Sequence, residues 1–283
     1  MVGSPRASSG SRSILQGLVL VATGLLFAVP LVASASFGFT LPNEGFTLEA
    51  VGDAVSGSDF APQVLQSLAL AALTTAASFA LLIPTLVWLH LHAQRWLPLA
   101  EALSVIPFVV PAVALVNGAN LAFRLTIPGF LTSVYSLVPF YVILTMPLVY
   151  RALDAGLRAI DLRTLCTASA SLGSGAVRTF FSIILPNLRP ALLTAALLSF
   201  TMVLGEFVLA TLLLHSTFPV FLVQIGQDHP RAAAGLSLIT IVSTWLLLSA
   251  LTGRGLTRRR RSPRPPGVET VAVPVTTNVR ISS

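Results

Sequence analysis

Six apolar stretches of about 20 residues or more dominate this sequence and leave little of it for a water-facing surface. A helix needs about 20 mostly apolar residues to cross the hydrocarbon core of a bilayer. Hydrophobic residues make up 54% of the 283 residues and charged residues only 10%, which is too apolar for a soluble globular chain. The sequence therefore predicts an all-helical membrane protein with six transmembrane helices, at residues 14–36, 64–89, 99–123, 134–153, 188–214 and 232–252.

The first apolar stretch also has features of a cleaved signal peptide. It follows Arg6 and Arg12, and the small residues from Ala33 to Ala35 resemble a cleavage site. However, the apolar run is longer than the usual signal-peptide core of about 7 to 15 residues, and more spans follow it. An uncleaved first helix is the favoured interpretation.

The basic residues are all arginines, and they gather on one side of a six-span arrangement. Most lie before the first span, in the connections after the second and fourth spans, and after the sixth, while the opposite loops carry only Arg124 and Arg231. Short cytoplasmic loops are enriched in arginine, so both termini are expected in the cytoplasm. The chain then divides into a cytoplasmic tail at 1–13, a transmembrane domain at 14–255 and a basic, proline-rich tail at 256–283 that we expect to be disordered.

The residue types present exclude several kinds of site. A phosphate-binding loop of the G-x-x-x-x-G-K-[ST] type needs a lysine, and this sequence has none, so the chain cannot carry that ATP site itself. The lone Cys166 excludes an internal disulfide and a cysteine metal cluster. His90 and His92 are two residues apart on a predicted helix and point in different directions, so we expect no metal site there. The run Arg258–Arg261 could attract lipid or nucleic acid, but a stop-transfer anchor explains it more simply, and we expect no nucleic-acid partner.

The polar-tolerant segment 157–185, between the fourth and fifth spans, has the pattern of a helical hairpin. Its first half repeats apolar residues at helical spacing, at Leu162, Leu165, Ala168 and Leu172. Gly173 can adopt backbone conformations that suit a turn. The second half is expected to stop before Pro186 and to have one broad apolar face, which consists of Val177, Phe180, Phe181 and Ile184. We expect this hairpin on the cytoplasmic side of the membrane.

The hairpin segment resembles the conserved cytoplasmic loop of binding-protein-dependent ABC transporter permeases. The residues that carry the resemblance are Ala168, Leu172, Gly173, Phe180, Ile183, Leu185 and Pro186, in the pattern A-x-x-x-L-G, then F, then I-x-L-P. The preceding run from Pro147 to Asp161 is similar as well, and the whole resemblance spans roughly residues 64–252. Where the family usually has Glu-Ala-Ala, this chain has Thr167, Ala168 and Ser169, which removes a carboxylate contact but keeps small residues.

The resemblance implies a type I importer permease in a bacterial inner membrane, with no catalytic residues of its own. In that family the hairpin is the coupling helix, which inserts into a groove of a separate ATPase subunit. The expected partners are two ATP-binding subunits that hold ATP and Mg, a second copy or paralogue of the permease, an extracytoplasmic solute-binding protein and membrane lipid. The coupling residues are then expected at Thr167, Ala168, Ser169, Leu172, Gly173, Phe180, Ile183, Leu185 and Pro186.

Glu206 is the best candidate for a substrate-pathway residue, because an ionisable group inside a span is costly without a partner or water. The sequence Gly205-Glu206-Phe207 resembles the branch of permeases for polyamines, molybdate or sulfate, and ferric iron. A carboxylate would attract an ammonium group, which favours spermidine or putrescine over oxyanions. The alternative is that the same machinery transports another small ion, such as molybdate or sulfate, ferric iron or aminoethylphosphonate. A packing role for Glu206 is equally compatible with the sequence. Asn117 and Asn120 could line the same route or bridge helices.

Two other classes of membrane protein fit the sequence less well. An intramembrane serine protease needs a nucleophile and a histidine within hydrogen-bond reach. Here His215 and His229 fall in a predicted outer loop, whereas Ser174 falls in a predicted cytoplasmic one. An autonomous secondary transporter often shows inverted repeats and several buried charges. We find no convincing repeat and, from the sequence, only Glu206 as a clearly buried charge.

Overall fold

The computed structural model describes residues 9–41 and 45–259, and these are helical almost throughout. Two-residue strands β1 (Thr40–Leu41) and β2 (Gly45–Phe46) pair antiparallel. A π-helical turn occupies Phe180–Ile184, and 3₁₀ turns occupy Gln94–Trp96, Phe130–Thr132 and Val134–Ser136. The α-helices are α1 (Ser9–Phe39), α2 (Glu49–Ser56), α3 (Phe60–His92), α4 (Leu97–Val109), α5 (Ala112–Thr126), α6 (Leu137–Arg158), α7 (Leu162–Ser171), α8 (Ala176–Thr179), α9 (Leu185–Asn187), α10 (Arg189–Leu204), α11 (Val208–Leu212), α12 (Phe218–Asp228) and α13 (Pro230–Arg259).

Long apolar helices give the protein its membrane character. Three segments of the described chain are long and apolar enough to cross a bilayer, at Gln16–Phe39, Phe60–His92 and Val134–Arg158. Two bent helix pairs, Gln94–Val109 with Ala112–Thr126 and Ala176–Asn187 with Arg189–Leu204, bring the number to five if each pair is one span. The sixth predicted span falls within α13. The count of six and the sidedness of the loops remain predictions. The predicted tail at 1–13 lies mostly, and the tail at 256–283 almost wholly, outside the described residues.

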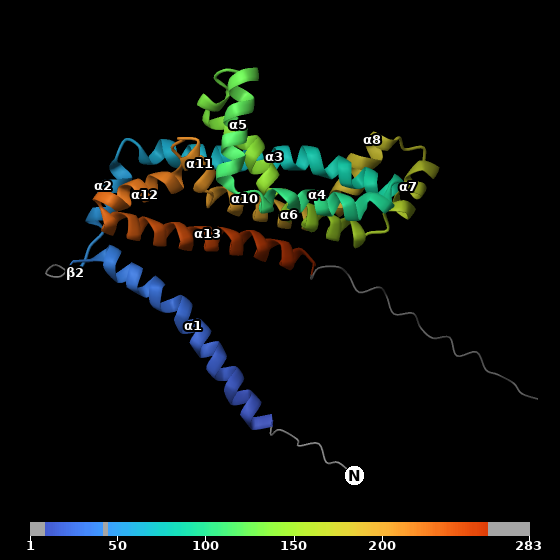
Figure 1. Ribbon diagram of the computed structural model, residues 1–283. Coiled ribbons are helices and arrows are strands. Elements are labelled where there is room, and N and C mark those ends of the chain that lie inside the picture. Colours follow the sequence, from blue (N-terminus) through green and yellow to red (C-terminus); the bar gives the residue numbers. More distant parts are fainter. Residues whose placement is uncertain (1–8, 42–44, 260–283) are drawn as a thin grey trace, which may run out of the picture. The chain divides into compact units, whose positions relative to one another are not determined.

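Two of the predicted spans were wrongly drawn as continuous helices. The span predicted at 99–123 breaks between α4 and α5, which are bent by 95° (Figure 1). The residue before a proline is disfavoured in helical conformation, and Val110, which precedes Pro111, is extended. The span predicted at 188–214 ends at Leu204, because Gly205 is a weak helix former. A new short helix begins at Val208, and the Glu206 side chain accepts the N–H of Leu209 in its first turn.

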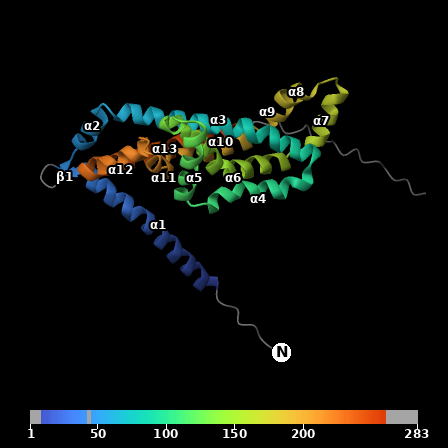
Figure 2. The same cartoon turned by 45° about the horizontal axis from the view of Figure 1, so that its top comes forward.

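The centre of the fold consists of α3, α6 and α10, which pack side by side, with α4 against α6 (Figures 1 and 2). Buried hydroxyl groups tie these helices together. Ser78 Oγ lies 3.3 Å from Thr145 Oγ1, and Thr75 Oγ1 donates to Ser199 Oγ at 3.1 Å. Such contacts are common between membrane helices, where small polar side chains permit close approach. In contrast, no residue in the most apolar window of α1 is buried, which suits a helix surrounded by lipid.

The length of α3 separates two regions of the fold. With 33 residues it is about 50 Å long. Near its start it contacts α2 and α12, and near its end it packs against α7 (Figure 2). The helical hairpin therefore lies at one end of α3, and the short helices α2 and α12 lie at the other.

Candidate functional site

A hydrogen-bonded cap starts the hairpin. The Asp161 carboxylate accepts the Thr164 N–H at 3.2 Å and the Thr164 hydroxyl at 2.7 Å, which holds the pKa of Asp161 below its usual value. Helix α7 then runs to Ser171, and the chain reverses at Gly173, whose φ of +76° lies in the left-handed region. A residue with a side chain would pay about 1 to 2 kcal/mol in that conformation. The predicted turn at Gly173 is confirmed.

Small hydroxyl side chains hold the two legs of the hairpin together. Ser169 Oγ and Thr179 Oγ1 are 2.7 Å apart, and both residues are buried. The Ser174 N–H also donates to the Ser169 carbonyl at 3.1 Å. At the three positions where the family usually has Glu-Ala-Ala, Thr167 and Ala168 are exposed, whereas Ser169 faces into the hairpin. Ser169 therefore stabilises the hairpin from within.

Three large apolar side chains of the hairpin are exposed on the surface of the described chain. The exposed fractions are 88% for Leu172, 73% for Val177 and 61% for Phe181. We call these three residues the apolar tip. None of them packs into the apolar cores of the described chain, so their exposure does not stabilise the fold. Exposed apolar side chains grouped in this way often mark an interaction site. The tip is the part of the described hairpin best suited to receive another surface.

The single apolar face predicted for the second leg was wrong. Phe180 packs against the core and Ile184 is buried within it, while Val177 and Phe181 point the other way. The π turn explains the split, because its extra residue per turn rotates the positions that follow relative to an α-helix. The predicted stop before Pro186 was also wrong, since helical conformation continues to Asn187. Ile183, Leu185 and Pro186 are half-buried.

A buried polar cluster that the sequence analysis missed lies at the base of the hairpin. His90 Nε2 and Asp154 Oδ1 are 2.8 Å apart, and the Arg158 guanidinium donates from Nε to Asp154 Oδ2 at 2.7 Å. A signal was present in the sequence, because His90 and Asp154 both fall at the cytoplasmic ends of predicted spans. His92 turns elsewhere and stacks on Trp88. Among residues 9–41 and 45–259, no three acidic, cysteine or histidine side chains converge on a possible metal position.

The Glu206 side chain accepts hydrogen bonds from backbone N–H groups at the break between α10 and α11. The residue is 9% exposed, and its carboxylate accepts two N–H groups, from Leu209 at 2.8 Å and from Ala210 at 3.3 Å. The first N–H groups of a helix have no partner within it, and an acidic side chain there satisfies them. This geometry matches the packing role that the sequence left open for Glu206.

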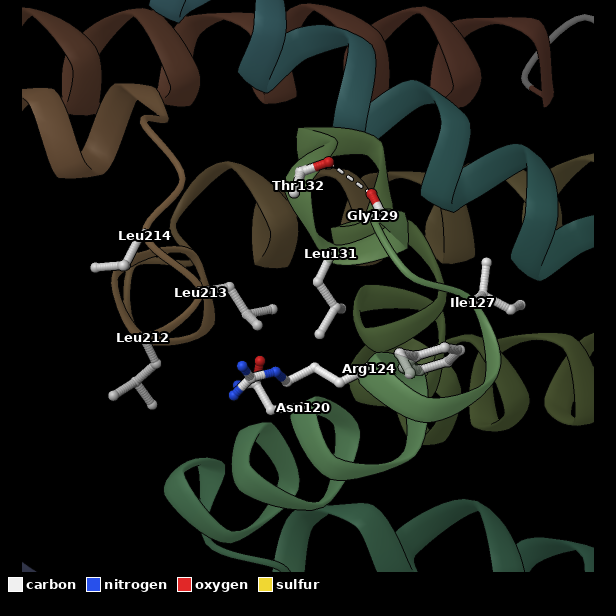
Figure 3. Close-up of a pocket in the computed structure, with 10 residues that line it drawn as sticks. Asn120, Arg124, Ile127, Gly129, Leu131, Thr132, Leu212, Leu213 and Leu214 are labelled. Carbon is white, nitrogen blue, oxygen red and sulfur yellow. Dashed lines mark hydrogen bonds between the residues drawn. The ribbon is translucent and has the colours of Figure 1, made fainter.

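A cavity of about 320 Å³ lies where α5 meets the loops around residues 127–132 and 212–214 (Figure 3). Arg124 and Asn120 lie side by side on α5, and leucines line the opposite wall. Thr132 donates its hydroxyl to the Gly129 carbonyl at 2.6 Å. Of the three predicted pathway residues, only Asn120 lines this cavity, while Asn117 is exposed elsewhere on α5 and Glu206 is not part of the wall.

Comparison with known proteins adds to this geometry. The model of the family described as "Binding-protein-dependent transport system inner membrane component" matches residues 93–261, which is more than half of the chain and includes the whole hairpin. The chain belongs to this family. It is therefore a multi-pass membrane protein and a permease component of an ABC system. Such permeases work with ATP-binding and substrate-binding components, and they are generally not catalytic themselves.

Three relatives of this permease show how far the likeness extends. An ABC transporter permease protein, ORF1, of Streptomyces antibioticus is 28% identical over 75% of this chain and 93% of its own length. A sulfate transport system permease protein of Chlorella vulgaris is 32% identical, over 43% of this chain and half of its own. The ABC transporter permease y4fN of Sinorhizobium fredii is 22% identical over 87% of this chain, which spans 45% of that protein.

A serine and a histidine meet beside the cavity in this permease. Ser136 Oγ lies 3.4 Å from His215 Nε2, a pair that the sequence analysis missed because it compared His215 only with Ser174. Ser136 is almost fully buried and so not open to a substrate. Burial lowers the pKa of His215, and the backbone of Leu131 partly opposes the shift. The pair joins the loop after α11 to the turn before α6.

Proposed function

We propose that this chain is the permease subunit of an ATP-driven importer and that it docks an ATP-binding subunit through the apolar tip. The observation that carries the proposal is the exposure of Leu172, Val177 and Phe181 on a hairpin held by Asp161, Gly173 and the Ser169–Thr179 pair. Complete burial of one large apolar side chain is worth about 1.5 to 3 kcal/mol. Three such side chains on a rigid support suit a stable docking site, even without the usual glutamate.

The full assembly follows from the same proposal. Two ATP-binding subunits would hold ATP and Mg, a second permease subunit would complete the pathway, and a solute-binding protein would deliver substrate from outside. The proposal places the chain in a bacterial inner membrane, with both termini in the cytoplasm, as the arginine distribution favours. Thr167 and Ala168, which are exposed beside the tip, would allow close approach of the ATP-binding subunit.

For the substrate we propose a small oxyanion in place of a polyamine. The polyamine hypothesis relied on an available carboxylate at Glu206, and both oxygens of that carboxylate accept backbone N–H groups. The cavity beside α5 contains Arg124, which has no carboxylate within ion-pair distance among the described residues. The likeness to a sulfate permease over half of that protein's length points in the same direction.

Copurification tests the docking proposal without knowledge of the substrate. The tagged chain is extracted from its native membranes, and the ATP hydrolysis that accompanies it is measured for the wild type and for Phe181→Asp. Loss of about 1.5 kcal/mol or more of apolar contact, with a charge added, should weaken docking at least about tenfold. Phe46→Asp is the matched control, because Phe46 is 73% exposed and belongs to β2, near the other end of α3.

The outcomes separate the proposal from its rivals. Copurified ATP hydrolysis that falls in Phe181→Asp and persists in Phe46→Asp supports docking at the apolar tip. Equal activity in all three proteins would mean that the tip faces lipid headgroups and that docking lies elsewhere. A wild-type chain with no accompanying ATP hydrolysis would favour an autonomous transporter. Such transporters often contain several buried charges, and the buried His90–Asp154 pair would fit that class as well.

A further inference from the structure

Asp154 joins two helices at the base of the hairpin. It belongs to the last turns of α6, and both of its carboxylate oxygens are occupied, one by His90 of α3 and the other by Arg158 of its own helix. Asp154 and His90 are 9% and 8% exposed. Because an isolated buried charge is costly, this carboxylate depends on both partners. The His90–Asp154 contact links positions 64 residues apart and is the only side-chain hydrogen bond between these ends of α3 and α6 among the described residues.

The same region contains the apolar contacts that fix the hairpin to the membrane helices. One core cluster includes Leu86 and Leu89 of α3, Leu153 and Leu157 of α6, and two hairpin residues, Leu162 and Ile184. Apolar contacts are not directional, so they specify the relative position of two helices less sharply than a hydrogen bond does. The hydrogen bond between His90 and Asp154 is directional and joins α3 to α6, so it favours one position of the end of α3 along α6, while Arg158 of the same helix supports the carboxylate.

We infer that Asp154 is a positioning residue for coupling: it locks the end of α3 to α6, so that a displacement of the hairpin moves both helices as one body. The inference rests on the proposed function, because it needs the hairpin to receive a push. The nearby pair of Arg151 and Glu101 has a different character. Its atoms are 3.5 Å apart and both side chains are largely exposed, so it contributes little to any lock.

The experiment measures whether α3 follows the hairpin. The complex of the full chain with its copurified ATP-binding subunits carries spin labels at Thr85→Cys in α3 and Ser171→Cys in α7, both exposed positions, with Cys166→Ser to remove the native thiol. Labelled chain is diluted with unlabelled chain so that the distance within one chain is read. The distance is recorded without nucleotide and after trapping with ATP and vanadate.

Four substitutions make the outcome decisive. The wild type and Arg151→Gln should keep the same distance in both states. Asp154→Leu should change it between the two states by about 2 Å or more, which is the scale of helix displacement at repacking interfaces, because leucine is of similar size but cannot accept a hydrogen bond from His90. His90→Gln should behave as the wild type because its amide can still donate to Asp154, whereas His90→Leu should behave as Asp154→Leu. The His90 variants decide the matter if Asp154→Leu fails to fold.

Two results would overturn the inference. One is an unchanged distance in both Asp154→Leu and His90→Leu, and the other is a nucleotide-dependent change in the wild type itself. ATP hydrolysis in the same samples keeps the two proposals apart. If Asp154→Leu retains the copurified hydrolysis and Phe181→Asp loses it, docking at the tip is intact in Asp154→Leu, and the measured distance alone tests the lock. Absence of hydrolysis from the wild-type complex would refute the proposed function instead.

Discussion

A close contact between α6 and α10, at Gly156 and Ala191, gives a stability prediction that can be worked out from the geometry. A Cβ added at Gly156 would lie 2.3 Å from the Ala191 Cβ and 3.4 Å from Leu188 Cδ2. Carbon atoms in contact are about 3.5 to 4.0 Å apart, so Gly156→Ala must push the two helices apart by roughly 1 Å. Overpacking of this kind costs about 1 to 3 kcal/mol.

A matched glycine removes the effect of helix propensity from the comparison. Alanine is favoured over glycine inside a helix by about 1 kcal/mol, and this gain would hide part of the cost at Gly156. Gly118 in α5 has no atom within 4 Å of an added Cβ, so Gly118→Ala reports the propensity gain alone. The two variants should therefore differ by about 1 to 3 kcal/mol. At about 2 to 4 °C per kcal/mol, the difference in thermal midpoint is roughly 2 to 12 °C.

The assay is thermal unfolding of the detergent-solubilised complex, followed by intrinsic fluorescence. Adding Ala191→Gly to Gly156→Ala returns the lost space and should recover most of the midpoint, because the two positions contact each other directly. Equal midpoints for Gly156→Ala and Gly118→Ala would refute the close packing of α6 on α10. Failure of Ala191→Gly to rescue would show that the loss has another origin.

Two further predictions concern the region around the helix break. Glu206→Gln should keep an acceptor for the Leu209 N–H and leave the thermal midpoint nearly unchanged, whereas Glu206→Ala should lose the cap and about 0.5 to 2 kcal/mol, visible as a lower midpoint in the same assay. Because burial lowers the pKa of His215, protonation opposes folding, so stability should be complete above the ordinary histidine value of about 6.5 and fall as the pH drops below it. His215→Gln should flatten that pH dependence, and an equally steep acid loss in this variant would assign it to another group.

Local chemistry allowed the sequence to predict the hairpin. Gly173 is placed between two helical patterns and has a left-handed φ, which few other residues adopt without strain. The α7 pattern begins directly after Asp161, a residue type favoured as a helix cap, and its side chain does cap the helix. These features depend on residues within one turn of each other, so a single sequence is enough to predict them.

The errors arose where the structure depends on a change of helix type or on distant residues. Average hydropathy over a window of about 20 residues does not respond to a break, so the interruptions at Pro111 and Glu206 were drawn as continuous spans. A period of 3.6 residues assigns Val177 and Ile184 to one face, and the π turn between them separates them. The contact between His90 and Asp154 joins two helices, and no local pattern reports which residues will face each other.

The two buried carboxylates of the membrane helices, those of Asp154 and Glu206, have one property in common that bears on the solute. Asp154 gives both oxygens to His90 and Arg158, and Glu206 gives both of its oxygens to backbone N–H groups. Both residues are also only 9% exposed, so little of either carboxylate is accessible to a passing cation. Arg124, in the wall of the cavity, has no such partner among the described residues. Its guanidinium presents several fixed donors suited to an oxyanion. The charge that this chain leaves open beside its cavity is therefore positive, which is why an anion fits the proposed pathway better than a polyamine.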